Sequence, residues 1–108
     1  MLVKRKWGWY VVLWETLNTK WKLLFFPEGS ELSMQRHRLR AEKWWVLAGK
    51  CGIHNDNDSN VFDPYLFRSG DVVDVPMGNW HKLAAWEFTI VLEKQYGELC
   101  EEWDIERV

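Results

Sequence analysis

Apolar and aromatic residues are gathered along this chain in short runs, which are separated by polar residues, glycine and proline. Two runs lie near the N-terminus, at residues 9–14 (WYVVLW) and 20–26 (KWKLLFF), on either side of the polar segment ETLNT. Short runs of this composition, bounded by turn-forming residues, are typical of β-strands. Residues 32–37 instead alternate, which places Gln35 and His37 on the same side of an extended segment.

Similar short segments follow up to residue 93, and turn signals separate them. The polar segment 54–60 (HNDNDSN) predicts a hairpin tip, because it lacks the glycine and the final glutamate of a calcium loop. The acidic tail, residues 96–108, is the one part without a β pattern, and we expect a helical turn or an extended arm there. The other predicted strands are residues 43–48, a short return strand after Gly49, and residues 61–67, 71–75, 81–85 and 86–93.

Many short strands with no helical segment between them predict one all-β domain, residues 1–108, folded as an antiparallel sandwich or barrel. A net charge of −2 argues against a protein that holds nucleic acid by its phosphates. The longest apolar runs are too short to cross a bilayer, so no membrane association is expected.

The compartment is predicted from the N-terminus and from the cysteines. The segment MLVKRKWGWY has no continuous apolar stretch, so we do not expect a signal peptide. Cys51 and Cys100 form no CxxC pair, which favours free thiols in a reducing compartment. We therefore expect a cytoplasmic protein.

Nine tryptophans in 108 residues are the one unusual feature of the composition. Tryptophan offers a large apolar surface with one N–H donor, which suits cores and interfaces. One barrel cannot enclose so many, so some should be exposed. We therefore expect a homodimer that pairs through the aromatic N-terminal strand, residues 7–14.

Four polar side chains are candidate metal ligands. Glu42 follows the Gln35–His37 pair after a short bend, and His81 comes just after a Pro-Met-Gly turn. The four converge if their segments form facing walls of a barrel. Two imidazoles, an amide oxygen and a carboxylate suit a borderline divalent ion. Zn²⁺ is the first expectation, and Mn²⁺, Fe²⁺, Co²⁺ or Ni²⁺ would also fit.

The glycines around these residues resemble the two cupin motifs. Residues 29–49 read G-x5-Q-x-H-x4-E-x6-G, which is similar to the first motif with glutamine in place of its first histidine. Residues 70–85 begin G-x5-P-x-G-x2-H and are similar to the second motif, with Ala85 where asparagine is frequent. Two motifs in the correct order imply the cupin double-stranded β-helix, a jelly-roll barrel.

Longer stretches resemble the C-terminal cupin domain of type II phosphomannose isomerases (mannose-6-phosphate isomerases). That family usually reads H-x-H-R-A-E-H-W where this chain has residues 37–44, so Leu39 and Lys43 replace two histidines. The similar segments are RKWGWY (5–10), KWK (20–22), LSMQRH (32–37), RAEKW (40–44), EKQYG (93–97) and DIER (104–107).

The resemblance implies a metal-dependent isomerase that interconverts mannose 6-phosphate and fructose 6-phosphate. The metal would polarise O1 and O2 of the sugar, and a base that the sequence does not identify would move a proton between C1 and C2. Arg107 and Lys22 are the catalytic candidates, as partners of the phosphate or of the developing enediolate. Trp44 and Trp80, together with Arg107, are the candidates for substrate binding.

Two other interpretations stay open. The first is a non-catalytic cupin that binds a sugar phosphate or a nucleotide-like ligand, and Leu39 and Lys43 favour it. The second is a metal-dependent dioxygenase, which usually needs three histidines, or two histidines and a carboxylate, with open coordination positions. Gln35 counts against this second alternative.

Overall fold

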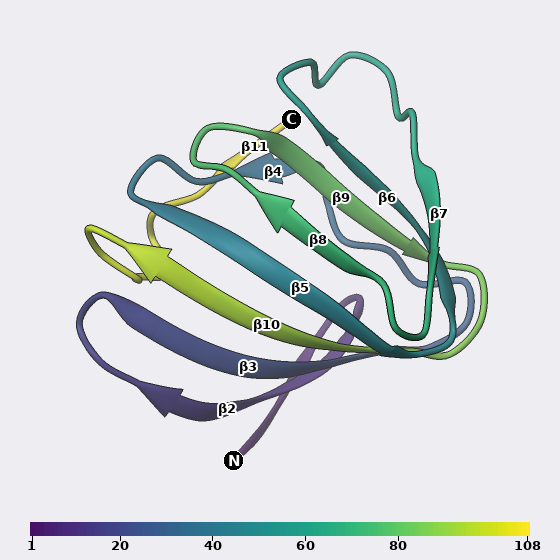
Figure 1. The fold of residues 1–108 in the computed structure, drawn as a ribbon, viewed down its shortest axis with the longest axis horizontal. Helices are drawn as coiled ribbons and strands as arrows, with labels where there is room; N and C mark the ends of the chain where they lie inside the picture. Colours follow the sequence, from purple (N-terminus) through teal and green to yellow (C-terminus); the bar gives the residue numbers. More distant parts are fainter.

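The structure, a computed structural model, describes all 108 residues, which form eleven β-strands in two antiparallel sheets (Figure 1). The larger sheet has the order β1 (Leu2–Arg5), β2 (Gly8–Glu15), β3 (Thr19–Phe26), β10 (Thr89–Gly97), β5 (Arg40–Ala48) and β8 (Val72–Val75). The smaller sheet has the order β11 (Glu106–Arg107), β4 (Gln35–Arg36), β9 (Trp80–Ala85), β6 (Lys50–Asp56) and β7 (Tyr65–Arg68). No helix long and apolar enough to cross a bilayer is found.

From β3 onward, nearly every connection carries the chain from one sheet to the other. Strands far apart in the sequence therefore become neighbours, such as β5 beside β10 and β4 beside β9 (Figure 1). This is the jelly-roll arrangement, so the predicted all-β fold is confirmed. The two motifs meet directly, because Gln35 of the first lies opposite His81 of the second.

The interior is divided into an apolar half and a polar half. Along β3, the buried side chains change from Lys20 and Lys22 to Leu24 and Phe26. Strands β5 and β10 run antiparallel to each other and show the same division, with their polar residues beside those of β3. The apolar half contains Tyr10, Leu24, Phe26, Leu32, Trp44, Val46, Cys51, Ile53, Val73, Leu83, Ala85 and Val91.

The predicted strands 9–14, 20–26, 43–48 and 81–85 lie within β2, β3, β5 and β9, and the return strand after Gly49 is β6. The prediction for 32–37 is too long, since only Gln35–Arg36 are paired as a strand. The prediction for 86–93 is wrong at its start, because residues 86–88 form the bend before β10.

The polar segment 54–60 differs from the predicted hairpin tip, because its first residue, His54, is buried in β6. His54 belongs to β6 rather than to the hairpin tip, and only Tyr65 to Phe67 of the predicted strand 61–67 are paired. The His54 ring fastens the intervening loop, since Nε2 lies 2.8 Å from the Asp58 carbonyl and Nδ1 accepts from the Asp63 N–H at 3.1 Å. The N-terminal strand β1 was not predicted, and the tail contributes β11.

The motif glycines Gly29, Gly49, Gly70 and Gly78 all have positive φ angles. Gly49 turns the chain from β5 into β6 with φ of 90°, and an added Cβ would lie 2.1 Å from the Phe88 carbonyl oxygen. Gly70 has a similar φ of 97°, but an added Cβ would meet no atom within 4 Å. Both positions favour glycine for the backbone, and only Gly49 also requires it for space.

Gly49→Ala is expected to lower the free energy of unfolding by more than about 3 kcal/mol, because backbone strain and a clash with Phe88 add together. Gly70→Ala is the matched control, and it should cost only about 1–2 kcal/mol for the left-handed conformation. Urea unfolding of both variants measures the difference. Equal losses would contradict the close approach at Gly49.

Candidate metal centre

His37, Glu42 and His81 meet inside the barrel, although they come from three separate segments. Glu42 Oε1 lies 3.2 Å from His81 Nε2, and Glu42 Oε2 lies 3.7 Å from His37 Nε2. All three residues are buried, with their ligand atoms within 4.8 Å of one another. His37 follows β4, Glu42 lies on β5 and His81 on β9, so the cluster joins the two sheets.

Backbone carbonyls orient both imidazoles. His37 Nδ1 lies 2.5 Å from the Asp104 carbonyl oxygen, and His81 Nδ1 lies 3.1 Å from that of Asn79. Because a carbonyl only accepts, each Nδ1 donates, and the neutral ring carries its lone pair on Nε2, which faces Glu42. Such outer contacts are typical of metal-binding histidines. Since the buried His81 Nε2 also has no hydrogen-bond partner, this donor set fits a divalent cation.

The charges in the cluster favour the ligand form of the carboxylate. Burial opposes ionisation of Glu42, but His81, Arg40 and His37 outweigh it and hold its pKa well below the usual value. Burial lowers the pKa of His37. Burial also opposes a charge on His81, but the Glu42 carboxylate outweighs this and raises its pKa. A bound cation would therefore displace a proton mainly at His81.

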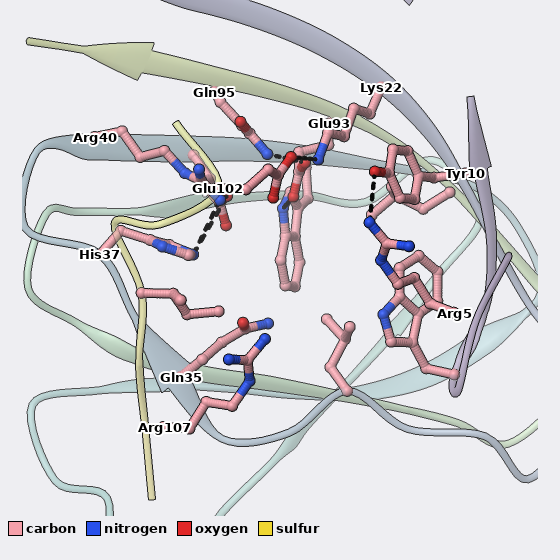
Figure 2. A pocket seen from close by; sticks show the side chains of 16 residues that line it. Arg5, Tyr10, Lys22, Gln35, His37, Arg40, Glu93, Gln95, Glu102 and Arg107 are labelled. Carbon is pink, nitrogen blue, oxygen red and sulfur yellow. Dashed lines mark hydrogen bonds and ion pairs between the residues drawn. The ribbon is translucent and has the colours of Figure 1, made fainter. Parts of the chain in front are cut away.

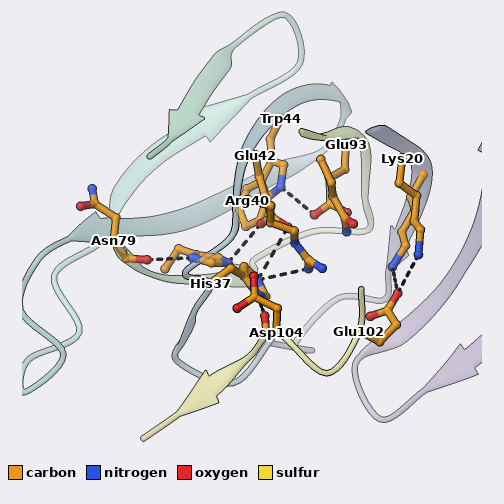
Figure 3. A network of polar contacts seen from close by, with 12 residues as sticks. Lys20, His37, Arg40, Glu42, Trp44, Asn79, Glu93, Glu102 and Asp104 are labelled. Atoms are coloured by element: carbon orange, nitrogen blue, oxygen red, sulfur yellow. Dashed lines mark hydrogen bonds and ion pairs between the residues drawn. The ribbon is translucent and has the colours of Figure 1, made fainter. Parts of the chain in front are cut away.

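Arg40 adds a buried cation to the same place. Its Nη2 lies 3.2 Å from Glu42 Oε2 and 3.3 Å from His37 Nε2, and its Nη1 donates to the Glu101 carbonyl. Arg40 and His37 thus both approach Glu42 Oε2 (Figure 3), while His81 approaches Oε1, and the guanidinium charge balances the carboxylate.

Gln35 lies beside the cluster on β4, opposite His81 in the strand register. It lines the same cavity as His37 and Glu42, and its amide lies near Arg107 in Figure 2. The structure brings His37, Glu42 and His81 together directly, and a fourth ligand bond from Gln35 stays a prediction.

His37 and Glu42 open into an inner cavity of about 120 Å³ (Figure 2). Trp44 lines it and donates from Nε1 to Glu93 Oε2 at 2.9 Å, while its ring meets His81 edge-on with centroids 5.6 Å apart. Lys22 is buried in the wall, 2.7 Å from Glu102. The polar residues that line the inner cavity only are Lys22, His37, Arg40, Glu42, Glu93, Gln95 and Glu102, together with the Tyr10 hydroxyl.

Glu93 is the second buried carboxyl group of the inner cavity. Gln95 Nε2 donates to Glu93 Oε1 at 2.7 Å. Glu93 makes no ion pair. Burial and the nearby Glu42 charge raise the pKa of Glu93 to about 7, against the opposing effects of Lys22 and Arg40.

A wider, basic mouth of about 600 Å³ adjoins the inner cavity, and the two share Arg5, Trp7, Leu32, Gln35 and Arg107 in their walls. The mouth also contains Lys6, and Lys82, whose Nζ is 3.0 Å from Glu31. Glu31 is its only acidic residue, so the mouth carries a net positive charge.

The predicted site residues differ in how they are placed. Lys22 and Trp44 lie in the inner cavity, and Arg107 lies where the cavity meets the mouth. Trp80 lies outside both and instead packs its ring 4.7 Å from the Arg36 guanidinium. The replaced family positions are also outside: Lys43 stands over the outward-facing ring of Trp45.

Sequence reasoning missed Arg40, Glu93, Gln95 and the mouth residue Arg5. The two-residue alternation along β10 could have revealed two of them, because Glu93 and Gln95 share the inward side of the strand with Val91. A carboxyl and an amide at inward positions of an otherwise apolar run indicate a polar cavity. Arg5 is brought to the mouth by β1, which has no apolar pattern of its own.

Comparisons with known proteins agree with this architecture. The family model described as mannose-6-phosphate isomerase C-terminal matches residues 1–108. A search of curated proteins found no match. Among solved structures, an RmlC-like cupin from Shewanella frigidimarina is similar, with a TM-score of 0.77 and 14% identity over 95% of this chain and 87% of that chain.

Two further structures extend the comparison. KdgF from Halomonas sp. has a TM-score of 0.72 and 12% identity, covering 88% of this chain and 82% of that one. Oxalate decarboxylase from Lactobacillus farciminis, in a formate complex, has a TM-score of 0.79 and 14% identity over 100% of this chain but 33% of its own length. At such identities these neighbours show the fold alone, which is the predicted cupin barrel.

The purified protein is expected to contain a stoichiometric divalent metal ion, with Zn²⁺ as the first expectation. His81→Ala should weaken metal binding by more than about 100-fold, beyond the effect of losing an outer contact. His54→Gln is the matched control, since His54 is equally buried but bonds only to loop backbone atoms. Mass-spectrometric metal analysis measures both, and full metal content in His81→Ala would refute the site. Gln35→Ala tests the fourth ligand.

Proposed function

Because the chain belongs to the mannose-6-phosphate isomerase C-terminal family of the cupin superfamily, we propose that it interconverts an aldose phosphate and a ketose phosphate, of the mannose 6-phosphate/fructose 6-phosphate type. One observation carries the proposal: a His–Glu–His cluster borders a polar inner cavity that leads to a basic mouth. A sugar phosphate has the matching shape, with a hydroxyl-rich body and a dianionic end.

The ligand set defines the role of the ion. His37, Glu42 and His81, with Gln35 as the fourth ligand, would hold a divalent ion, which would supply a Lewis acid for the carbonyl oxygen of the open-chain sugar. Trp44 forms a flat wall beside this position and excludes water from it.

The basic residues have different roles, some at the phosphate of the substrate and one at its sugar oxygens. Arg107, at the junction with the mouth, binds the phosphate together with Arg5 and Lys6 through charge-assisted hydrogen bonds. Lys22 lies in the wall of the inner cavity, fixed by Glu102, and stabilises negative charge that develops on the sugar oxygens.

The alternatives keep the same ligand set and differ in the chemistry. The non-catalytic cupin was suggested by Leu39 and Lys43, but neither lines the cavity, so they give no reason to expect a lost reaction. Two histidines and a carboxylate also suit an iron-dependent dioxygenase. The polar inner cavity favours a hydroxylated substrate and the basic mouth favours an anionic one, which together support the isomerase.

A row of apolar side chains on the outer face of the larger sheet supports the proposal that the chain forms a homodimer. The row crosses five strands in register, and none of its members belongs to the core cluster; it consists of Val11, Leu23, Leu92, Trp45 and Val72. Trp21 stacks on Trp45 at 5.6 Å. We propose that a second copy of the chain covers this face, with Trp9 and Val11 of β2 at its edge.

The metal-loaded protein is expected to convert mannose 6-phosphate to fructose 6-phosphate in a coupled assay. Arg107→Ala should raise KM about 10- to 100-fold, which corresponds to one hydrogen bond to a charged group, with a smaller effect on kcat. Arg68→Ala, an exposed arginine on β7 outside the cavity, is the control.

The other outcomes identify the alternatives. A thermal shift with sugar phosphates but no turnover would indicate the binding cupin, and oxygen uptake with a small organic substrate would indicate the dioxygenase.

Leu92→Arg is expected to convert the dimer to a monomer, because it places a charge at the centre of the apolar row. Light scattering after size-exclusion chromatography measures the mass. Thr16→Arg, at the exposed β2–β3 turn, should leave the dimer intact. A wild-type monomer at micromolar concentration would contradict the proposed pairing.

A further inference from the structure

We propose that Glu93 is the base that moves the proton between C1 and C2 of the bound sugar. The inference rests on the proposed isomerase function and names a group that the sequence did not identify. It comes from the arrangement of acidic and basic groups around the inner cavity.

Strand register places Glu93 next to the metal cluster. Glu42 on β5 lies opposite Gln95 on β10, and Glu93 lies opposite Trp44, so the two glutamates are diagonal neighbours on the same inward face. Diagonal residues on paired strands are separated by about 7–8 Å. A sugar that reached the cluster through the inner cavity would therefore also lie close to the Glu93 carboxyl group.

The other acidic groups of the cavity are engaged by cations. Glu42 contacts Arg40 and His81 at 3.2 Å each. Glu102 lies 2.7 Å from Lys22 and 3.6 Å from Lys20. A carboxylate tied to a cation is a weaker proton acceptor. Among the acidic residues that line the inner cavity, Glu93 alone makes no ion pair.

Neutral donors hold Glu93 in position and leave part of its capacity to accept a proton free. Trp44 Nε1 donates to Oε2 at 2.9 Å (Figure 3), and Gln95 Nε2 donates to Oε1 at 2.7 Å (Figure 2). Each carboxylate oxygen has two lone pairs, so one on each stays available. The side chain is buried, and its raised pKa, near 7, supports uptake and release of a proton near neutral pH.

The step balances without any other reactant. Glu93 accepts the C2 proton of the open-chain aldose phosphate, the C–H electron pair forms the C1=C2 bond, and the carbonyl electrons move to O1. The hydroxyl proton on O2 then passes to O1, and Glu93 returns its proton to C1 as the carbonyl forms at C2. The carboxylate ends in its starting form.

Glu93→Gln tests the assignment, because it keeps the shape of the side chain and removes the base. Metal content and the thermal shift caused by mannose 6-phosphate should match those of the wild type. Turnover should fall by more than about 1,000-fold, within the range expected for a general base. In D₂O, NMR should show deuterium entering C2 of mannose 6-phosphate with the wild type but not with the variant.

Glu93→Asp is the second variant, and it should retain metal and exchange deuterium at a rate reduced at least tenfold. The inference is overturned if Glu93→Gln or Glu93→Asp exchanges at the wild-type rate, or if the loss of turnover follows a loss of bound metal. If the wild type and Glu93→Gln both turn over mannose 6-phosphate, the assignment of Glu93 as the base is wrong and the isomerase function stands. If the metal-loaded wild type neither converts mannose 6-phosphate nor exchanges deuterium into it, both the isomerase function and the assignment of Glu93 are wrong.

Discussion

The constraint on which this structure depends is the compensation of charge inside a small barrel. An unpaired buried ion costs several kcal/mol, yet the polar half of the interior encloses Lys22, Arg40, Glu42 and Glu93. Ion pairs limit this cost, since Arg40 lies 3.2 Å from Glu42 and Lys22 lies 2.7 Å from Glu102. Replacing buried ion pairs by apolar residues is often neutral or stabilising, so stability alone does not account for the polar half.

The C-terminal segment, which ends in β11 of the smaller sheet, completes the compensation of charge. Three of its acidic residues, at a spacing of two, each contact a different part of the barrel, and Figure 3 shows two of them, Glu102 and Asp104. Glu102 approaches Lys20 and Lys22, and Glu106 pairs with Arg36 and Arg38. The Asp104 carboxylate accepts the backbone N–H groups of residues 38 and 39, at 3.1 and 2.8 Å. The acidic tail is thus a wall of the site.

Local sequence patterns were sufficient to predict most strands and the metal-ligand cluster, but not the other residues of the cavity. Alternation and glycine spacing identified most strands and the His37–Glu42–His81 cluster, because both depend on short-range geometry and on motif spacing. The loop after β6 was misjudged because His54 organises it through contacts that no periodicity encodes. The tail was left undefined because its order comes from Asp104 and Glu106 binding distant residues. Glu93 was overlooked because only the pairing of β10 with β5 reveals its neighbours.

The carbonyl of Asp104 connects the C-terminal segment to the candidate cation ligands, because it accepts a hydrogen bond from the ring of His37. Docking of this segment and affinity of the cluster for a cation would therefore be thermodynamically reciprocal: whatever strengthened one would strengthen the other by the same free energy. A modification or a partner protein that detached residues 98–108 from the barrel would then weaken cation binding without contacting the cluster.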